Sequence, residues 1–269
     1  MVAVSQILPT TGRAQEGGHW YTRTGAPAYE IPAATGAMRP VTLRDARKLG
    51  LLPGVSSILA MEAKPMLEAW KISQALMSAL TLPRLPGESD DAFIERARTD
   101  SKEQARKAAE RGTQLHAAIQ GSFDGAPTAA EDIPYVEGVR AWIGQRYGLA
   151  GWTAECSFAH PHGYGGKSDL HHLKIPVVLD IKCKDFGEDK RAKDLAWPEH
   201  CMQLAAYREG HGIPKADCAN VFVSTRVPGL VVVREWDDEE LADGWAAFQC
   251  LLKLWQIRKD YYPGLERAA

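Results

Sequence analysis

Two aspartates and a lysine lie close together in residues 163–186, whose sequence is GYGGKSDLHHLKIPVVLDIKCKDF. An apolar run ends at Asp180, and Lys182 follows two residues later. On a strand, the side chains of these two residues therefore point to the same face. Asp169 lies near the end of the preceding strand-like segment, and a hairpin through residues 171–176 would bring it toward Asp180. Because neighbouring carboxylates repel each other unless a cation lies between them, this spacing indicates a cation site.

Carboxylate oxygens of this kind suit Mg²⁺ or Mn²⁺, which keep several waters and also bind the oxygens of a substrate phosphate. A lysine beside such an ion can orient or help deprotonate a metal-bound water, and it can stabilise charge that builds on a phosphate. The D-x-K spacing by itself is explained as well by a paired charge at the end of a strand. The metal-site hypothesis therefore depends on Asp169 as much as on Asp180 and Lys182.

Three residues outside this stretch could join the site. His116 lies in the sequence RGTQLHAAIQG, near the end of a charged helix expected over residues 90–121. Gln203 and Tyr207 are four residues apart in the sequence CMQLAAY, so they share one face of an expected helix. A single histidine on a helix is more often structural than a ligand, and a glutamine–tyrosine pair can be ordinary helix surface. Each of these residues is therefore a weak signal when it is taken alone.

The elements that would position these residues follow from the periodicity of the sequence. Residues 1–50 are rich in Gly, Pro, Thr and Ala and are expected to be irregular, apart from a short hairpin within residues 19–32. Ser56 or Ser57 can cap a helix that Pro65 interrupts. The remaining predicted elements are helices over 90–121 and 134–147, strands over 152–161, 163–172 and 175–183, a helix over 196–212, strands over 218–227 and 229–236, and a helix over 237–260. This order predicts one α/β domain over residues 51–269, with a core at about 110–230 and a helical N-terminal addition.

The composition is that of an ordinary soluble globular protein, with 45% hydrophobic and 25% charged residues in a chain of 269. The formal net charge is −2, so a nucleic-acid partner would have to be held by a local basic patch. The five cysteines are scattered and include no C-x2-C pair, which indicates neither a zinc knuckle nor a disulfide framework. We find no secretory signal and no apolar stretch approaching the roughly 18 residues that span a bilayer, and we expect a cytoplasmic location.

Four motifs are far more specific together than apart. In their order and spacing, GTQLH, GGKSD, VVLDIKC and QLAAY resemble the PD-(D/E)XK nuclease superfamily, and within it the RecB-type and phage exonuclease branch. The resemblance covers about residues 110–210. It implies a restriction-endonuclease-like core, in which helices flank a mixed central sheet, and divalent-metal-dependent cleavage of DNA.

The resemblance also implies roles for particular residues. Asp169 and Asp180 match the two metal carboxylates, and Lys182 matches the catalytic lysine. His116 matches the helix histidine, while Gln203 and Tyr207 match the QxxxY helix that lies close to the active site and the DNA. Glu155 looks like an additional acidic residue that some phage members carry. The implied metal set is Asp169, Asp180 and the Ile181 carbonyl, with His116 or Glu155 adding a ligand or an outer contact.

The resulting hypothesis is a Mg²⁺- or Mn²⁺-dependent deoxyribonuclease, in particular a phage or prophage exonuclease that degrades DNA ends for recombination or repair. Basic residues near the site would neutralise DNA phosphates, namely Lys167, Lys184, Arg106 and Arg111. A phage recombinase or annealing protein is the expected protein partner in the bacterial host cell, and a homo-oligomer is compatible with the family.

Two further features limit the chemistry, and two alternatives stay open. The cysteine spacing differs from that of iron–sulfur members, so we expect no cluster, and the lack of a G-x-x-x-x-G-K-[ST] motif indicates no nucleotide cofactor or helicase motor. One alternative is a DNA-end-binding recombination accessory protein with little or no turnover. The other is a metal-dependent hydrolase of nucleotides or small phosphate esters.

Overall fold

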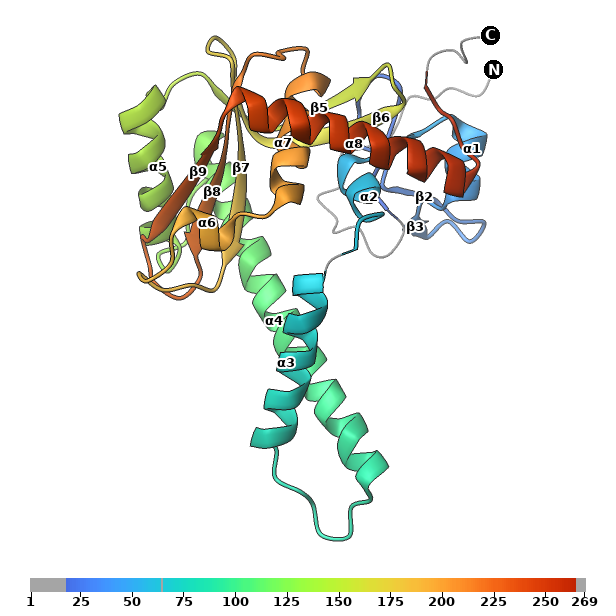
Figure 1. Ribbon diagram of the computed structural model, residues 1–269, viewed down its shortest axis with the longest axis vertical. Coiled ribbons are helices and arrows are strands. Elements are labelled where there is room, and N and C mark those ends of the chain that lie inside the picture. The colour runs from blue at the N-terminus through green and yellow to red at the C-terminus, as the bar shows by residue number, and fades with distance from the viewer. Residues whose placement is uncertain (1–17, 64, 265–269) are drawn as a thin grey trace.

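A five-stranded mixed sheet forms the centre of the protein, as a computed structural model shows for residues 18–63 and 65–264 (Figure 1). Its strands follow the chain order, β5-β6-β7-β8-β9. Their bounds are Trp152–His160, Tyr164–His172, Val177–Lys184, Asp217–Ser224 and Val231–Trp236. Neighbouring strands are antiparallel except β7 and β8, which are parallel and are joined by a crossover through α6 (Ala192–Leu195) and α7 (Pro198–Gly210).

The predicted hairpin between the two aspartates is confirmed. Strand β6 pairs with β7 in antiparallel register at Leu170–Leu179 and His171–Val178. Among the described residues, β6 and β7 pair only at these two positions. Asp169 and Asp180 lie immediately past the paired positions, so the hairpin carries both carboxylates to the point where the strands separate.

Helices cover both faces of the sheet. One face packs against α4 (Asp90–Phe123) and α5 (Ile133–Tyr147), with Val177, Leu179 and Ile181 pointing into that core. The intervening Val178 belongs to the opposite core, with α7 and α8 (Asp238–Lys259). This alternation follows from the two-residue period of a strand, and it turns Asp180 and Lys182 toward α7.

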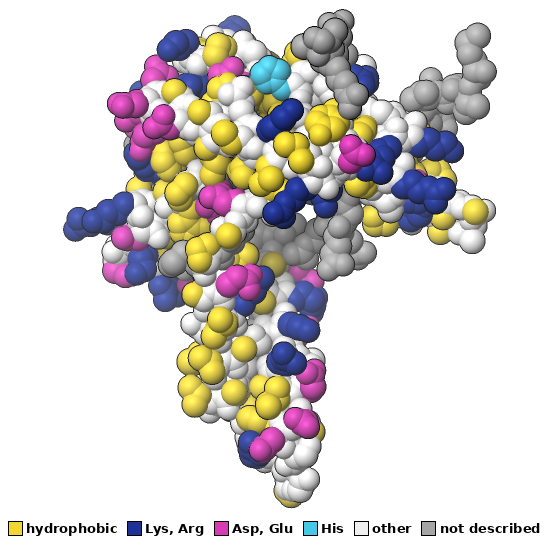
Figure 2. Space-filling model, turned by 45° about the vertical axis from the view of Figure 1, so that its right-hand side comes forward, with side chains coloured by type: hydrophobic (Ala, Val, Ile, Leu, Met, Phe, Trp, Pro, Cys, Tyr) yellow, Lys and Arg dark blue, Asp and Glu magenta, His cyan; other side chains and the backbone are white. Residues whose placement is uncertain are grey.

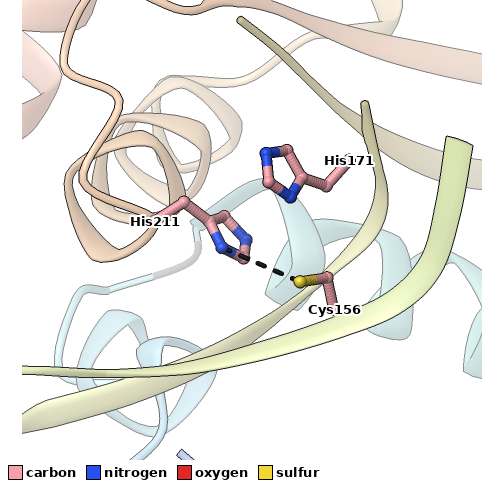
Figure 3. A group of neighbouring side chains, drawn as sticks. All are labelled: Cys156, His171 and His211. Atoms are coloured by element: carbon pink, nitrogen blue, oxygen red, sulfur yellow. Dashed lines mark hydrogen bonds between the residues drawn. The ribbon is translucent and has the colours of Figure 1, made fainter. Parts of the chain in front are cut away.

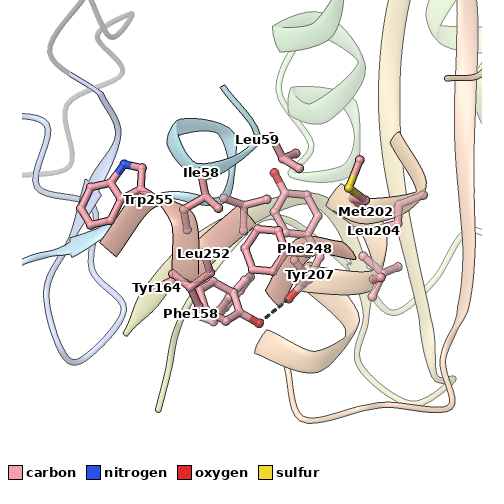
Figure 4. Packing of buried hydrophobic residues seen from close by; sticks show 14 of the residues in the cluster. Ile58, Leu59, Phe158, Tyr164, Met202, Leu204, Tyr207, Phe248, Leu252 and Trp255 are labelled. Carbon is pink, nitrogen blue, oxygen red and sulfur yellow. Dashed lines mark hydrogen bonds between the residues drawn. The ribbon is translucent and has the colours of Figure 1, made fainter. Parts of the chain in front are cut away.

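The core on the α7 side is tightly packed around Phe158 and Tyr164, which lie against Tyr207 and Phe248 (Figure 4). Gly210 ends α7 here, where an added Cβ would come within 1.9 Å of the Phe158 ring. A side chain at position 210 would therefore push α7 away from the sheet, and only glycine allows this close approach.

The N-terminal part differs from the irregular segment that the sequence predicted. It contains the strands β1 (Trp20–Tyr21), β2 (Glu30–Pro32), β3 (Met38–Pro40) and β4 (Leu52–Pro53), and the helices α1 (Leu43–Leu49) and α2 (Val55–Leu59). Helix α1 has a reciprocal cap, in which the side chain of Thr42 and that of Asp45 each accept a backbone N–H of the other. Trp20, Val41 and Ala46 are buried in the core that α7 and α8 share. Residues 1–17 lie outside the described residues.

The start of α2 also differs from the prediction, because its N-cap is Gly54 and no side chain caps it. Ser57 instead accepts a hydrogen bond from the His19 backbone N–H, at 3.1 Å, and Ser56 contacts the His19 ring, also at 3.1 Å. Both serines therefore tie the N-terminal segment to α2 rather than starting the helix.

A helical hairpin projects from the body of the protein (Figure 1). It consists of α3 (Pro65–Thr81) and the first half of α4, which Ser89 caps. Apolar side chains gather on this arm (Figure 2), and the large exposed ones on α3 are Trp70, Ile72, Leu76, Met77 and Leu80. Even so, none of the helices in the described residues combines the length and apolar character needed to cross a membrane.

Candidate active site

Asp169 joins three elements at the open end of the hairpin. Its Oδ2 accepts a hydrogen bond from the Ile181 backbone N–H at 2.6 Å and lies 3.0 Å from Nε2 of His116 on α4. Gln120, one turn further along α4, donates to Oδ1 at 3.4 Å. Asp169 thus bridges β6, β7 and α4, which is why residues far apart in the sequence meet here.

Asp180 is held from two sides. The residue is 1% exposed, and Nζ of Lys182 lies 2.9 Å from Oδ1 and 2.8 Å from Oδ2. On the neighbouring strand β8, Asn220 donates from Nδ2 to Oδ2 at 2.8 Å. A carboxylate with so little exposure depends on such partners, because unpaired buried charge is costly.

Helix α7 completes the group. Gln203 Oε1 accepts a hydrogen bond from Lys182 Nζ at 3.0 Å, and Gln203 Nε2 donates to the Tyr207 hydroxyl at 2.7 Å. We call this connected set the Asp–Lys network; its members are His116, Asp169, Asp180, Lys182, Gln203, Tyr207 and Asn220. The network has one half around Asp169 and another around Asp180. They are connected because Ile181, whose N–H donates to Asp169, directly follows Asp180 in the chain.

The two carboxylates differ in their pKa values because their partners differ. For Asp169, burial favours the protonated acid, but the charges of His116 and Lys182 and the Ile181 N–H outweigh burial and lower the pKa. For Asp180, burial and the charge of Asp169 prevail over the attraction of Lys182, so the pKa is raised. Two interacting acids with opposite shifts behave as a pair that holds one negative charge more readily than two.

The pKa values of both basic members of the network, Lys182 and His116, are raised. Burial alone would lower the pKa of Lys182, but the charges of Asp180 and Asp169 and the hydrogen bond to Asp180 raise it above its usual value. Burial likewise opposes the charged form of His116, and Asp169 overcomes it, so the pKa of this imidazole is raised. At neutral pH Lys182 is therefore a cation and not a free base.

A pocket of about 310 Å³ opens onto the network between α4 and β7. It is lined by Ala108, Ala109, Gly112, Thr113, His116, Ile181, Lys182, Cys183 and Lys184. Small residues of α4 form one wall, so the helix comes close without covering Lys182. The pocket gives His116 and Lys182 access to solvent, and hence to a ligand.

Glu155, which the resemblance makes an additional acidic residue of the site, lies on β5. Its side chain forms an ion pair with Lys167, across the β5–β6 ladder, and it is 43% exposed. The residue has a positive φ of 56°, which is unusual for a non-glycine residue. Lys167 is close enough to the network to be affected by the charge of Asp169. Burial lowers the pKa of Lys167, and the charge of Asp169 offsets only part of this effect.

The four basic residues expected to meet DNA are all engaged within the protein. Arg106 pairs with Glu103 at 2.6 Å and also with Glu110, and Arg111 pairs with Asp132 at 2.7 Å. Lys184 lines the pocket, donates to the Leu195 carbonyl at 2.8 Å and lies 4.0 Å above the Trp197 ring. Burial and the charge of Lys182 lower the pKa of Lys184 to about 8. Among these four residues, only Lys184 lines the pocket.

The donor atoms of the network suit a hard divalent cation, because they are carboxylate oxygens and one imidazole nitrogen. Their spacing is wider than in a closed metal site: among the described residues, only Cys156, His171 and His211 bring three ligand atoms within 4.8 Å of one another. An ion at Asp169 and Asp180 would have to share oxygens with His116 and Lys182. The Ile181 backbone meets Asp169 through its N–H, and its carbonyl as a ligand stays a prediction.

The sequence did not identify Asn220, Gln120 or the Cys156 group. Asn220 sits in the apolar sequence CANVFVS, and a fully buried amide within such a run is the only signal that could have drawn attention to it. The register of the parallel pair β7–β8, which sets Asn220 opposite Asp180, cannot be derived from either strand alone.

The chain is similar to two solved structures, both at low identity. No family model matches the chain, and no curated protein matches it. Among solved structures, the crystal structure of SSO0001 is similar to 69% of this chain and 86% of its own length, at 13% identity and a TM-score of 0.30. An alkaline exonuclease from Laribacter hongkongensis covers 72% of this chain and 98% of its own, at 16% identity and a TM-score of 0.29.

Proposed function

We propose that the protein is a divalent-metal-dependent DNA nuclease with a PD-(D/E)XK core, and that it acts as an exonuclease on DNA ends. The observation that supports this most is the connected network from His116 through Asp169 and Asp180 to Lys182 and Gln203. Paired charge at a strand end explains Asp180 and Lys182, but it does not require a second, half-buried carboxylate such as that of Asp169, which accepts a hydrogen bond from the N–H of the next residue, Ile181. A phosphodiester bond with its anionic oxygens is a substrate that such a cationic and metal-binding site can accept.

Each residue has a role that its contacts support. Asp169 and Asp180, with the Ile181 carbonyl, would hold Mg²⁺ or Mn²⁺, which when bound acidifies a water and neutralises phosphate charge. Lys182 is protonated, so it orients the attacking water and stabilises the phosphate oxygens instead of removing a proton. Gln203 fixes the direction of the Lys182 amine, and Tyr207 fixes Gln203. Lys184 supplies a cation at the mouth of the pocket for a DNA phosphate.

A second candidate is a DNA-end-binding accessory protein with little turnover, and one feature favours it. Both oxygens of Asp180 already have partners, because Lys182 contacts each of them and Asn220 donates to Oδ2. Metal binding at Asp180 competes with the Lys182 contact. If Lys182 keeps both oxygens in the DNA complex, the site binds phosphate without cleaving it.

The experiment compares linear and circular duplex DNA with and without Mg²⁺. We expect metal-dependent degradation of the linear form only, because an exonuclease needs an end. Lys182→Ala and Asp180→Asn should lose cleavage by 10²-fold or more, on the order of one transition-state contact, while far-UV circular dichroism stays unchanged. Lys190→Ala is the matched control, since Lys190 is an exposed lysine paired with the adjacent Asp189 at 3.2 Å.

Two results would decide against the nuclease. Unchanged cleavage by Asp180→Asn would show that the activity comes from elsewhere. Tight binding of DNA ends with no metal-stimulated cleavage by the wild type would support the accessory protein. Action beside a phage recombinase or annealing protein in a bacterial host, and assembly into a homo-oligomer, belong to the same proposal and would be tested by co-purification and by the mass of the protein in solution.

A further inference from the structure

Three side chains with soft or borderline metal-ligand atoms meet outside the Asp–Lys network (Figure 3). Cys156 comes from β5, His171 from β6, and His211 caps the C-terminus of α7. One ligand atom from each lies within 4.8 Å of those from the other two, and Cys156 Sγ is 4.0 Å from His211 Nδ1. The two imidazole rings are stacked, with centroids 4.5 Å apart.

A neighbouring serine orients the His211 ring. Ser168 Oγ lies 2.8 Å from His211 Nε2 and 3.4 Å from the Cys156 carbonyl oxygen, to which its hydroxyl can donate; it then accepts a hydrogen bond from Nε2. The proton of the neutral ring is then on Nε2, and Nδ1 directs its lone pair toward Cys156. Metal-binding histidines are commonly held in this way, with one ring nitrogen bound to a protein oxygen and the other free for the ion.

His171 provides a second, independent observation. Its Nδ1 is buried and has no hydrogen-bond partner among the described residues. A buried polar atom without a partner is costly in free energy, and an ion beside Cys156 and His211 would remove that cost. The cluster therefore contains an unmet ligand atom as well as an oriented one.

We propose that Cys156, His171 and His211 form a second metal site, which binds a borderline-soft divalent ion such as Zn²⁺. One sulfur and two imidazole nitrogens are a Zn²⁺ donor set, and they differ from the carboxylate oxygens that Mg²⁺ prefers. When the ion binds, the Cys156 thiol releases its proton to solvent and the S–H bond is replaced by a metal–sulfur bond. The fourth position stays open to water or to a ligand.

Binding requires a small rearrangement. Zinc–ligand bonds of about 2.0–2.3 Å place tetrahedral ligand atoms about 3.3–3.7 Å apart, which is closer than the 4.0 Å between Cys156 Sγ and His211 Nδ1. The stacked rings must also turn, because the ion lies in the plane of each imidazole that binds it. The result ties β5, β6 and the end of α7 together next to Ser168, one residue before Asp169.

Cobalt titration tests the site, because tetrahedral Co²⁺ has visible bands and its bond to a thiolate adds a near-ultraviolet charge-transfer band. The full chain, without an added histidine tag and freed of metal by a chelator, should bind one equivalent of Co²⁺ with both signals. Zn²⁺ should displace the cobalt, and excess Mg²⁺ should not. Cys156→Ser should lose the charge-transfer band, and His171→Asn should weaken binding at least tenfold. Cys250→Ser, which changes an exposed cysteine, should behave like the wild type.

A second measurement separates loss of binding from loss of folding. Zn²⁺ should raise the Tm of the wild type and of Cys250→Ser, but not that of Cys156→Ser or His171→Asn, whose folding is checked by circular dichroism. The proposal is overturned if the wild type shows no thiolate band, if Cys156→Ser keeps the band, or if Asp180→Asn abolishes it. None of these signals requires DNA cleavage, so the result is independent of the proposed nuclease activity.

Discussion

Asn220 donates from Nδ2 to Oδ2 of Asp180 over 2.8 Å, across the parallel pair of strands in which these two residues lie opposite each other. The orientation of the amide is fixed by Trp236, whose Nε1 can only donate and lies 2.7 Å from Asn220 Oδ1. The oxygen of Asn220 therefore faces the indole and its NH₂ group faces the carboxylate. A chain of contacts thus runs from the sheet edge at β9 to the buried carboxylate of the candidate site.

Asn220→Leu should destabilise the protein and reduce cleavage. The change removes one of the two partners of Asp180 Oδ2 and leaves the Trp236 N–H without an acceptor, at a cost of about 2–4 kcal/mol and on the order of 5–10 °C in Tm. Because Asp180 would lose its orientation, we expect cleavage to fall about 10–100-fold. Thermal unfolding and initial rates measure both effects. Trp236→Phe is the control, since it keeps the Asn220–Asp180 bond; equal loss of activity in both variants would show that Asn220 has no specific effect on Asp180.

Gln203→Leu should lower activity with little effect on stability. The residue is half-buried on α7, and its Oε1 accepts from Lys182 at 3.0 Å. Without this acceptor, Lys182 keeps only Asp180, so its amine turns fully toward the carboxylate and away from the substrate. We expect kcat to fall about 10–100-fold with a Tm near that of the wild type. Steady-state kinetics on linear DNA test this.

Tyr207→Phe gives the graded control for Gln203. It removes the hydroxyl that accepts from Gln203 Nε2 at 2.7 Å but leaves the Lys182–Gln203 bond in place. Its loss of activity should lie between those of the wild type and Gln203→Leu. A Tyr207→Phe variant less active than Gln203→Leu would mean that Tyr207 contacts the substrate directly.

DNA binding should weaken as the pH rises through about 8, because Lys184 loses its charge there. Burial, and then the charge of Lys182, lower the pKa of this amine to about 8, so it is a cation at pH 7 and largely neutral at pH 9. Losing one phosphate contact should make the slope of log K against log salt less steep by about 0.9. Fluorescence anisotropy with Ca²⁺ in place of Mg²⁺ measures binding without cleavage.

Lys184→Arg should keep its charge and show a smaller change in affinity between pH 7 and pH 9, since arginine stays protonated over this range. Lys190→Arg changes an exposed lysine outside the pocket and should follow the wild type. If all three proteins lose affinity equally with pH, Lys184 is not the residue that contacts the phosphate.

The sequence predicted best where local signals and the fold agree. The hairpin between Asp169 and Asp180 was predictable, because an apolar run bounded by turn residues can pair with its neighbour in few ways. Helix α8 was also predictable, and its capping box at Asp237 and Glu240 marks the start that the periodicity indicated. The short hairpin expected within residues 19–32 is present, since Tyr21 and Pro27 form an antiparallel bridge. Prediction failed at residues 30–49, where short elements are stabilised by tertiary contacts such as the hydrogen bond from the Tyr261 hydroxyl to the Ala46 carbonyl.

The candidate site shows the same division. Asp169, Asp180 and Lys182 could be grouped from their spacing, but the partners that hold them could not. Asn220 reaches Asp180 through the register of β7 and β8, and Arg106 and Arg111 are taken up by acidic neighbours that a charge count does not reveal. The Cys156 cluster joins three residues far apart in the chain, and the arrangement of cysteines alone gave no sign of it.

The stability of the protein should fall as the pH drops from about 6.5 to about 4, in part because of His211. Burial, and then the charge of His171, lower the pKa of His211 to about 4 in the folded state. Between these pH values the unfolded chain binds a proton that the folded chain does not, so acid favours unfolding. After allowance for partial exposure, the loss is about 1–3 kcal/mol and is complete below pH 4.

Urea unfolding at several pH values, in the presence of a chelator that keeps metal away from the cluster, measures this effect. His211→Asn removes the titrating ring, so its free energy of unfolding should depend less on pH between 4 and 6.5 than that of the wild type. His162→Asn alters an exposed histidine whose charge helps to lower the pKa of His160, so this comparison variant should keep the part of the pH dependence that comes from His211. Equal pH dependence in all three proteins would mean that His211 can be protonated without unfolding, because its stack on His171 opens to water before the core does.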